Sequence, residues 1–308
     1  MDVAGVLAEH FVNPDAQPRY LAGAFHGLRI PIHANGHIDY AAENADRDRV
    51  LDTGRWLVRN GTDRCAVTVG LAILAAVGIE ARDIPLVQTI GLLSDRFGPL
   101  AARALKQVEG GAQALIWLGE RAEGWGRVYI VEALCSLRDP TTFPWLLKKA
   151  VDGDILNGYF AGKVAITGRL HEATERFGND PELVDATSRL LWVMSECEGM
   201  GATLGPYPHA GRVLSAHSQA LAQMDPTPIR IQTAAVIAQY LGRKNPTAAA
   251  TSAAWNAARA LYLETLAREA WAKEARSALA CQDRVMVWVA KDIAPGLGLP
   301  WAEASAQE

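Results

Sequence analysis

Three histidines and one aspartate stand close together near the start of the chain. His26, His33, His37 and Asp39 fall within fourteen residues, around a stretch rich in glycine, proline and histidine (27–37) that we expect to be an irregular loop. Imidazole and carboxylate groups are common ligands of zinc, and a folded loop can bring them together. The spacing matches no established metal motif. We therefore assign no metal site and no cofactor, and expect loop histidines that bond the backbone or face solvent.

The other groups with chemical potential occur as isolated pairs. His171 precedes Glu172, and such pairs resemble those of helical-repeat di-iron hydroxylases, which use several of them where this chain has one. Ser215 and His217 lack a third member of a catalytic triad. No phosphate-binding loop, dinucleotide fingerprint or nucleophile elbow is present. The sequence names no catalytic residue and leaves open whether the protein is an enzyme.

Arginine and tryptophan side chains form a second group of candidates. Arg55 and Arg59 are four residues apart, which places them on one face of a helix. Arg121 and Arg127 would extend that basic stripe if successive helices stack in register. Tryptophan and arginine supply much of the contact energy at protein interfaces, although a role in stabilising the fold competes with binding. The predicted binding residues are Arg55, Trp56, Arg59, Trp117, Arg121, Trp125, Arg127 and Trp145.

Composition limits the class of protein. Half of the 308 residues are apolar and 21% are charged, which is enough for a sizeable core and argues against global disorder. The formal net charge of −4 is unlike that of a dedicated nucleic-acid binder. The four cysteines lie far apart and form no C-x-x-C pair, so we expect buried thiols in a reducing compartment.

The sequence also predicts a cytoplasmic location. The first residues, Met1–Val12, have no basic segment of the kind that opens a signal peptide. The longest apolar stretch, Ala66–Ile79, is too short to span a bilayer.

Turn and capping residues divide the chain into helices. We expect short helices at Val3–Val12 and Asp15–His26, a helix ending at Asn60-Gly61, and a helix capped by Thr62 or Asp63 that runs to Val77-Gly78. Further on, the pattern predicts helices at Pro181–Glu198 (capped at Asp180), Ala210–Met224, Ile229–Leu241 and Pro246–Arg268, and a frayed tail at Ala302–Glu308.

Three leucines mark a repeat. Leu74, Leu105 and Leu134 are separated by 31 and 29 residues, and each belongs to a helix, a short turn and a second helix. Such a hairpin cannot bury its own apolar face, so neighbouring hairpins must stack. The best copy is Glu132–Leu147, which contains Asp139-Pro140 at the turn and Pro144 in the second helix.

This copy resembles the consensus of HEAT-like helical repeats. The preceding segment from Trp125 to Leu134 is similar to the family's arginine-containing helix, with Arg127 at the arginine position, and Gly124-Trp-Gly-Arg127 resembles a segment of uncharacterised bacterial helical-repeat proteins. The resemblance covers roughly residues 46–175 and implies an all-α fold, a HEAT-like α-solenoid. We predict a helical head with the histidine loop (1–45), HEAT-like repeats (46–205), and a C-terminal helical bundle or cap (206–308).

The resemblance implies a scaffold without a fixed activity. We expect a non-enzymatic protein that binds a protein partner on a concave surface, as a regulatory or immunity-type factor. The alternative is a helical-repeat enzyme or ligand binder, similar to DNA glycosylases of this architecture or acting on a flat aromatic small molecule. A protein partner is favoured, a small molecule is the second choice, and acidic residues between the arginines disfavour nucleic acid. The partner and the oligomeric state are not determined by the sequence.

Overall fold

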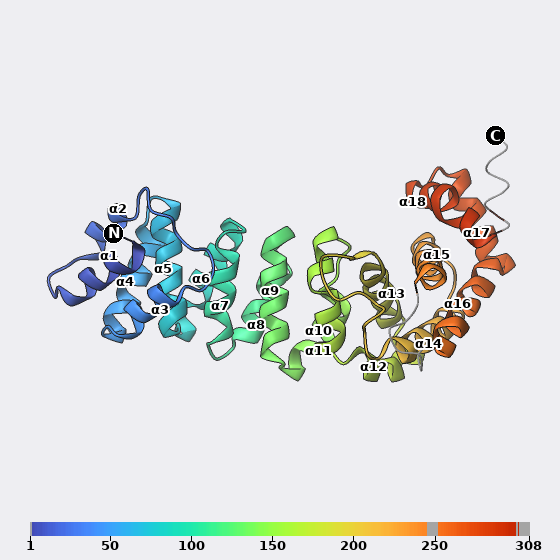
Figure 1. The fold of residues 1–308 in the computed structure, drawn as a ribbon, viewed down its shortest axis with the longest axis horizontal. Helices are drawn as coiled ribbons and strands as arrows, with labels where there is room; N and C mark the ends of the chain where they lie inside the picture. Colours follow the sequence, from blue (N-terminus) through green and yellow to red (C-terminus); the bar gives the residue numbers. More distant parts are fainter. Residues whose placement is uncertain (1, 245–251, 300, 302–308) are drawn as a thin grey trace. The chain divides into compact units, whose positions relative to one another are not determined.

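The protein is all-α. The computed structural model describes residues 2–244, 252–299 and 301, of which none forms a β-strand, and 74% of the chain is helical (Figure 1). The helices pack in sequential pairs. The chain divides into two compact units, residues 1–142 and 143–308. This division differs from the three segments suggested by the sequence, whose boundaries stay a prediction.

The first unit contains nine α-helices and two short 3₁₀ turns within its described residues. The α-helices are α1 (Val3–Val12), α2 (Pro18–Ala24), α3 (Gly36–Glu43), α4 (Arg47–Asn60), α5 (Arg64–Val77), α6 (Ile84–Leu93), α7 (Gly98–Lys106), α8 (Gly111–Gly119) and α9 (Gly124–Leu137), and the turns are η1 (Ala81–Asp83) and η2 (Pro140–Thr142).

Local signals in the sequence account for several of these helix ends. The predicted helix Val3–Val12 is confirmed as α1, and α4 ends where Gly61 follows Asn60. Asp63 caps α5 by accepting hydrogen bonds from two backbone N–H groups. Helix α3 was not predicted. Its N-cap is Asn35, whose side chain accepts from the next turn, inside a stretch whose glycine and proline indicated only a loop.

Helices α4 and α5 form a close pair because each has a glycine at the contact. A Cβ atom built on Gly70 would lie 2.9 Å from the Leu57 Cβ and 3.0 Å from the Gly54 carbonyl oxygen. A Cβ on Gly54 would lie 2.6 Å from the Leu74 Cγ. Both helices therefore approach to a distance that only glycine permits.

The later helices of the first unit follow a regular order of contacts. Helix α5 packs against α7, and α7 packs against α9. Helix α6 also packs against α8. The three leucines used to find the repeat, Leu74 on α5, Leu105 on α7 and Leu134 on α9, are all buried in this interior.

The second unit begins with short helices and continues with longer ones. Its helical segments are α10 (Phe143–Lys149), η3 (Ile155–Tyr159), α11 (Ala161–Thr167), α12 (Leu170–Ala173), η4 (Thr174–Asn179), α13 (Pro181–Glu196), α14 (Ala210–Leu221), α15 (Pro228–Arg243), α16 (Ser252–Ala267), α17 (Glu269–Ala280), α18 (Arg284–Trp288), η6 (Val289–Ile293) and η7 (Ala294–Leu297).

The predicted helices of this unit are present with small shifts in their ends. Asp180 caps α13 by accepting from the Leu183 N–H, as its position before Pro181 suggested. The helix predicted at Pro246–Arg268 corresponds to α16, which ends at Ala267, and the extended Arg268 separates it from α17. The start of that helix (246–251) and the tail (302–308) lie outside the described residues.

The cysteine prediction is correct in part. Cys135 and Cys197 are buried and Cys65 is half-buried, but Cys281 is exposed because it follows the end of α17 at a turn. In the part of the chain that the structure describes, no helix has the length and apolar character needed to cross a membrane.

Candidate functional site

Two exposed tryptophans flank the turn that joins α8 to α9. Trp117 lies in the last turn of α8 and Trp125 in the first turn of α9, and their exposed fractions are 37% and 39%. Large aromatic side chains are usually more buried than this, because each removes a large apolar area from water. We call the group of Trp117, Arg121 and Trp125 the hairpin surface.

Arg121 holds the first of these tryptophans in place. Its guanidinium carbon lies 4.2 Å from the centre of the Trp117 ring, and its Nη1 donates a hydrogen bond of 2.8 Å to the Trp117 carbonyl. Glu120 pairs with the same guanidinium at 3.5 Å. The arginine therefore covers one ring face with a cation, a geometry in which the ring quadrupole attracts the charge.

Trp125 belongs to a row of three rings. Its ring lies 6.0 Å from that of Tyr129, one turn later on α9, with 29° between the planes. His33 from the N-terminal loop contacts the Tyr129 ring edge-on at 5.3 Å. Burial raises the pKa of Tyr129, and the carboxylates of Asp95 and Glu132 raise it further. Through Tyr129, His33 of the N-terminal loop therefore lies near the predicted binding residue Trp125.

Arg127 points away from this row and into the protein. Its side chain is buried, and Nη1 donates to the Gly119 carbonyl at 2.6 Å and to the Ala122 carbonyl at 3.5 Å. The last carbonyl groups of a helix lack partners within the helix, so this side chain satisfies the end of α8. In this structure Arg127 stabilises the turn that presents the two tryptophans.

The arginines of α4 do not form one exposed stripe. Arg59 is exposed, but Arg55 is buried and makes two hydrogen bonds of 2.8 Å with the Asp83 carboxylate. Glu80 accepts a third bond of 2.6 Å from Arg55. Burial alone would raise the pKa of Asp83, but the bonds from Arg55 and from the Glu80 N–H hold it below its usual value. Arg55 therefore joins α4 to η1, and Trp56 beside it is half-buried.

Trp145 is the only predicted binding residue in the second unit. It lies on α10 and is buried. Its role in binding stays a prediction.

The histidine loop contains no cluster with the geometry of a metal site. Asp39 accepts two hydrogen bonds from Arg103 on α7, at 2.8 and 3.0 Å. His26 and His37 are exposed, and His33 contacts Tyr129 as described above. Across the residues described by the structure, no three or more His, Cys, Asp or Glu side chains are grouped to hold an ion.

His171 contacts both a second histidine and its neighbouring glutamate. Its ring stacks on that of His209 with 3.6 Å between the centres, and its Nε2 lies 3.7 Å from Glu172, which also pairs with Arg169 at 3.3 Å. Burial lowers the pKa of His171, and the neighbouring His209 lowers it further. The charge on Glu172 opposes this change.

Sequence reasoning missed a buried chain of polar side chains in the second unit. His217 lies 2.8 Å from the Ser188 hydroxyl through Nε2 and 2.6 Å from the Tyr262 hydroxyl through Nδ1. The Ser188 hydroxyl also donates to the Val184 carbonyl at 3.2 Å. All three side chains are buried, so the group connects α13, α14 and α16 and has no access for a substrate. The signal in the sequence was the position of His217 on the apolar face of its helix, not its neighbour Ser215.

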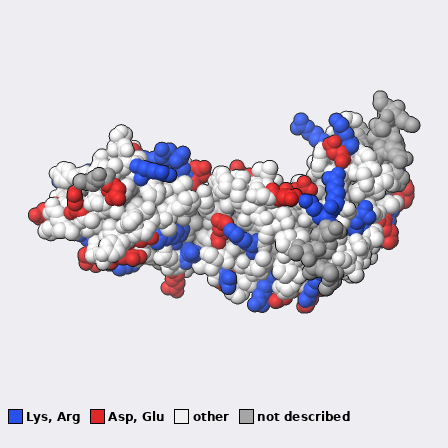
Figure 2. Space-filling view, viewed as in Figure 1, with Lys and Arg blue, Asp and Glu red and all other residues white. Residues whose placement is uncertain are grey.

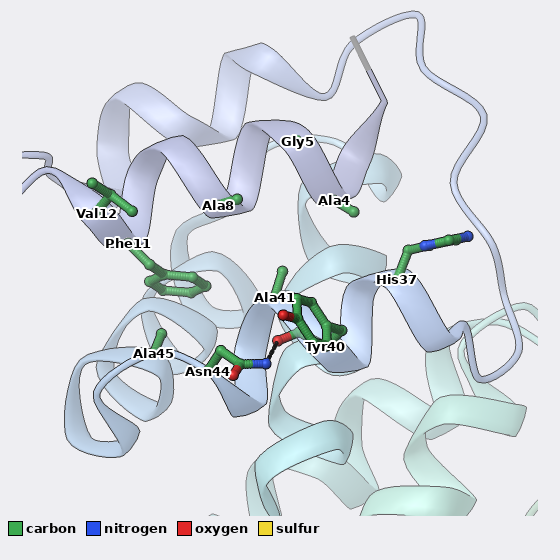
Figure 3. Close-up of a pocket in the computed structure, with 10 residues that line it drawn as sticks. All are labelled: Ala4, Gly5, Ala8, Phe11, Val12, His37, Tyr40, Ala41, Asn44 and Ala45. Atoms are coloured by element: carbon green, nitrogen blue, oxygen red, sulfur yellow. Dashed lines mark hydrogen bonds between the residues drawn. The ribbon is translucent and has the colours of Figure 1, made fainter.

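The first unit also contains an open groove of about 370 Å³ between α1 and α3 (Figure 3). Small side chains line most of it, with Phe11 and Tyr40 on opposite sides. No arginine, lysine, aspartate or glutamate is among its lining residues. It contains one histidine of the loop, His37, and none of the predicted binding residues.

Charges of both signs are interspersed on the face of the described residues that Figure 2 shows. This face has the mixed pattern expected from the net charge of −4. No known protein family, curated protein or solved structure matches the chain. The resemblance to HEAT-like repeats therefore depends on the sequence motif and is part of the proposal below.

Proposed function

We propose that this protein is a non-enzymatic scaffold of HEAT-like repeats that binds a protein partner. The observation that carries the proposal is the pair of exposed tryptophans, Trp117 and Trp125, at one end of the α8–α9 hairpin. Partly exposed tryptophans with an adjacent arginine are the residues that most often dominate the binding energy of protein interfaces. In this proposal, successive helical pairs form an α-solenoid, and the tryptophans lie on its concave surface.

The order of contacts supports the architectural part of this proposal. The pair α4–α5 packs on the pair α6–α7, and that pair packs on α8–α9. Repeats of a solenoid bury in this way the face that one hairpin leaves open. Arg127 and its two carbonyl acceptors make the α8–α9 turn rigid. A rigid turn presents the tryptophans with little loss of conformational entropy on binding, which favours a stable complex.

The test is affinity purification of the tagged chain from its native host, with mass spectrometry of the intact complexes and a comparison of variants. We expect a stoichiometric protein companion with the wild-type chain and its loss from the double variant Trp117→Ala/Trp125→Ala. The matched control is Trp288→Ala, which removes a tryptophan of equal exposure, 39%, from α18 in the second unit.

Two outcomes would contradict the proposal. A companion that the double variant retains as well as the wild type would show that the hairpin surface does not bind it. A chain recovered without protein but with the mass of a small molecule would instead favour the alternative, a helical-repeat enzyme or binder of a flat aromatic ligand. Binding to DNA that weakens steeply with salt would favour a glycosylase-like protein.

A further inference from the structure

The groove between α1 and α3 has an apolar floor of small residues. Ala4 and Ala8 come from α1, and Ala41 and Ala45 come from the end and flank of α3. The volume is about 370 Å³, and one side is open to solvent (Figure 3). Alanines at intervals of four residues lie on one face of a helix, so the floor runs along both helices.

Large apolar side chains stand at the edges of this floor and are not covered by the described residues. Tyr40 is 70% exposed and Val12 is 83% exposed. An exposed apolar face promotes association with another molecule. Helices α1 and α3 present such a face with a groove in it, which favours binding there.

Each of the two helices has an exposed glutamate within one helical turn of residues that line the groove. Glu9 is exposed and lies one turn from both Gly5 and Val12 of the α1 wall. Glu43 is exposed and lies one turn beyond Tyr40 of the α3 wall. Neither glutamate makes an ion pair within the part of the chain that the structure describes. The groove therefore has an apolar floor, and helical spacing puts one exposed glutamate of each helix near it.

We infer that this groove binds an amphipathic helix of a protein partner, with an apolar stripe flanked by lysine or arginine. Alanines allow the backbone of a docked helix to approach closely, and its aliphatic side chains would fill the space between Phe11 and Tyr40. Basic residues on both sides of the stripe would meet Glu9 and Glu43. The groove and the hairpin surface share no residue, so this inference and the proposed function can fail separately.

The probe is a synthetic leucine–lysine peptide of about 18 residues, with the leucines on one helical face, a length at which isolated helices begin to be stable. Its affinity for the full chain is measured by fluorescence anisotropy, and its position by amide shifts in NMR spectra. We expect saturable binding with shifts in α1 and α3. A leucine–glutamate peptide of the same pattern is expected to bind at least about tenfold more weakly, since like charges would meet beside the groove.

Variants of the chain separate binding in the groove from general attraction to an acidic protein. Ala8→Lys places a long cation on the floor at an exposed helical position, and should weaken the lysine peptide about tenfold or more without loss of helix content. The double variant Glu9→Gln/Glu43→Gln should lower the affinity for the lysine peptide several-fold and reduce the dependence of that affinity on salt. The control Gln219→Lys adds the same charge at an exposed position of α14 in the second unit and should change nothing beyond the small effect of net charge.

The inference is overturned if Ala8→Lys and Gln219→Lys bind the lysine peptide equally, or if the glutamate peptide binds as well as the lysine peptide. It is also overturned if the chain itself forms a dimer that Ala8→Lys dissociates in sedimentation experiments. In that case, a second copy occupies the groove.

Discussion

The side chain of His217 shows how one residue can tie several helices together. Its two ring nitrogens lie 2.8 Å from the Ser188 hydroxyl and 2.6 Å from the Tyr262 hydroxyl, so each neighbouring helix supplies one partner. If Tyr262 donates to Nδ1, Nε2 carries the proton and donates to Ser188, which donates to the Val184 carbonyl. Each polar group of this chain then has a hydrogen-bond partner, and the His217 imidazole is in its neutral form.

Acid should destabilise the second unit through this histidine. Burial lowers the pKa of His217 from 6.5 to about 4, so the unfolded chain binds a proton that the folded chain excludes between these values. The stabilising contribution is complete above pH 6.5 and is lost as the pH falls toward 4, by about 2 kcal/mol at pH 5 from this group alone. Urea unfolding of the wild type and of His217→Gln at pH 7 and pH 5 measures this, and the variant should show the smaller loss. An equal loss in both chains would assign the acid sensitivity to other groups.

Helix packing in the first unit depends on positions without side chains. At the α4–α5 contact, Gly54 and Gly70 each lie against the backbone oxygen of the other. The α8–α9 turn depends instead on a long side chain, because Arg127 reaches back to the carbonyl groups of Gly119 and Ala122. The two devices fix different parts of the same unit, and each can be removed by one substitution.

We expect Gly70→Ala to destabilise the protein by about 2 kcal/mol, because the new methyl group overlaps Leu57 and Val58 and forces α4 and α5 apart. The control is Gly23→Ala in α2, where an added Cβ meets nothing within 4 Å and alanine favours the helix. Chemical unfolding followed by circular dichroism compares the two. A Gly70→Ala chain as stable as Gly23→Ala would show that the pair of helices can separate without cost.

Arg127→Ala should mainly lower stability, whereas Trp125→Ala should mainly lower binding of the partner. Removing Arg127 leaves buried carbonyl groups without a charged donor and should cost about 2 kcal/mol of stability. Trp125 is 39% exposed, so Trp125→Ala should lower stability less than Arg127→Ala does. It should weaken binding of the partner more than Arg127→Ala does. Thermal unfolding and retention of the companion protein are measured on both variants. If Arg127→Ala loses stability but keeps the companion, Arg127 is removed from the predicted binding residues.

The whole molecule consists of two compact units that contain their own polar networks. The first holds the ion pairs of Arg55 with Asp83 and Glu80, and the second holds the chain through His217. Breaking a buried ion pair by removing one partner typically destabilises a protein by about 3 kcal/mol. A loss of stability in one compact unit need not lower the stability of the other.

Arg55→Ala and Tyr262→Phe should therefore act on different halves of the chain. Hydrogen exchange is expected to accelerate within residues 1–142 for Arg55→Ala and within residues 143–308 for Tyr262→Phe. In the double variant the two effects should add, as they do for distant residues without shared partners. Acceleration of both units by either substitution would show that they unfold as one.

The sequence by itself determined the elements whose signals are local. Asp63 and Asp180 marked helix starts, Gly61 marked a helix end, and α1 was predicted with its exact bounds, because capping and turn chemistry depend on neighbouring residues. The two tryptophans of the hairpin surface were also candidates from the sequence. Helix α3 was missed because its cap, Asn35, lies within a glycine- and histidine-rich stretch.

Only the tertiary structure decided which side chain meets which. Arg55 and Arg59 look alike in the sequence, yet Asp83, 28 residues further on, draws Arg55 into the core. His217 lies 45 residues from Tyr262, and Asp39 lies 64 residues from Arg103. A periodic pattern predicts the face of a helix, but the partner on that face depends on how distant helices pack, and that packing distinguished the buried arginines from the exposed tryptophans.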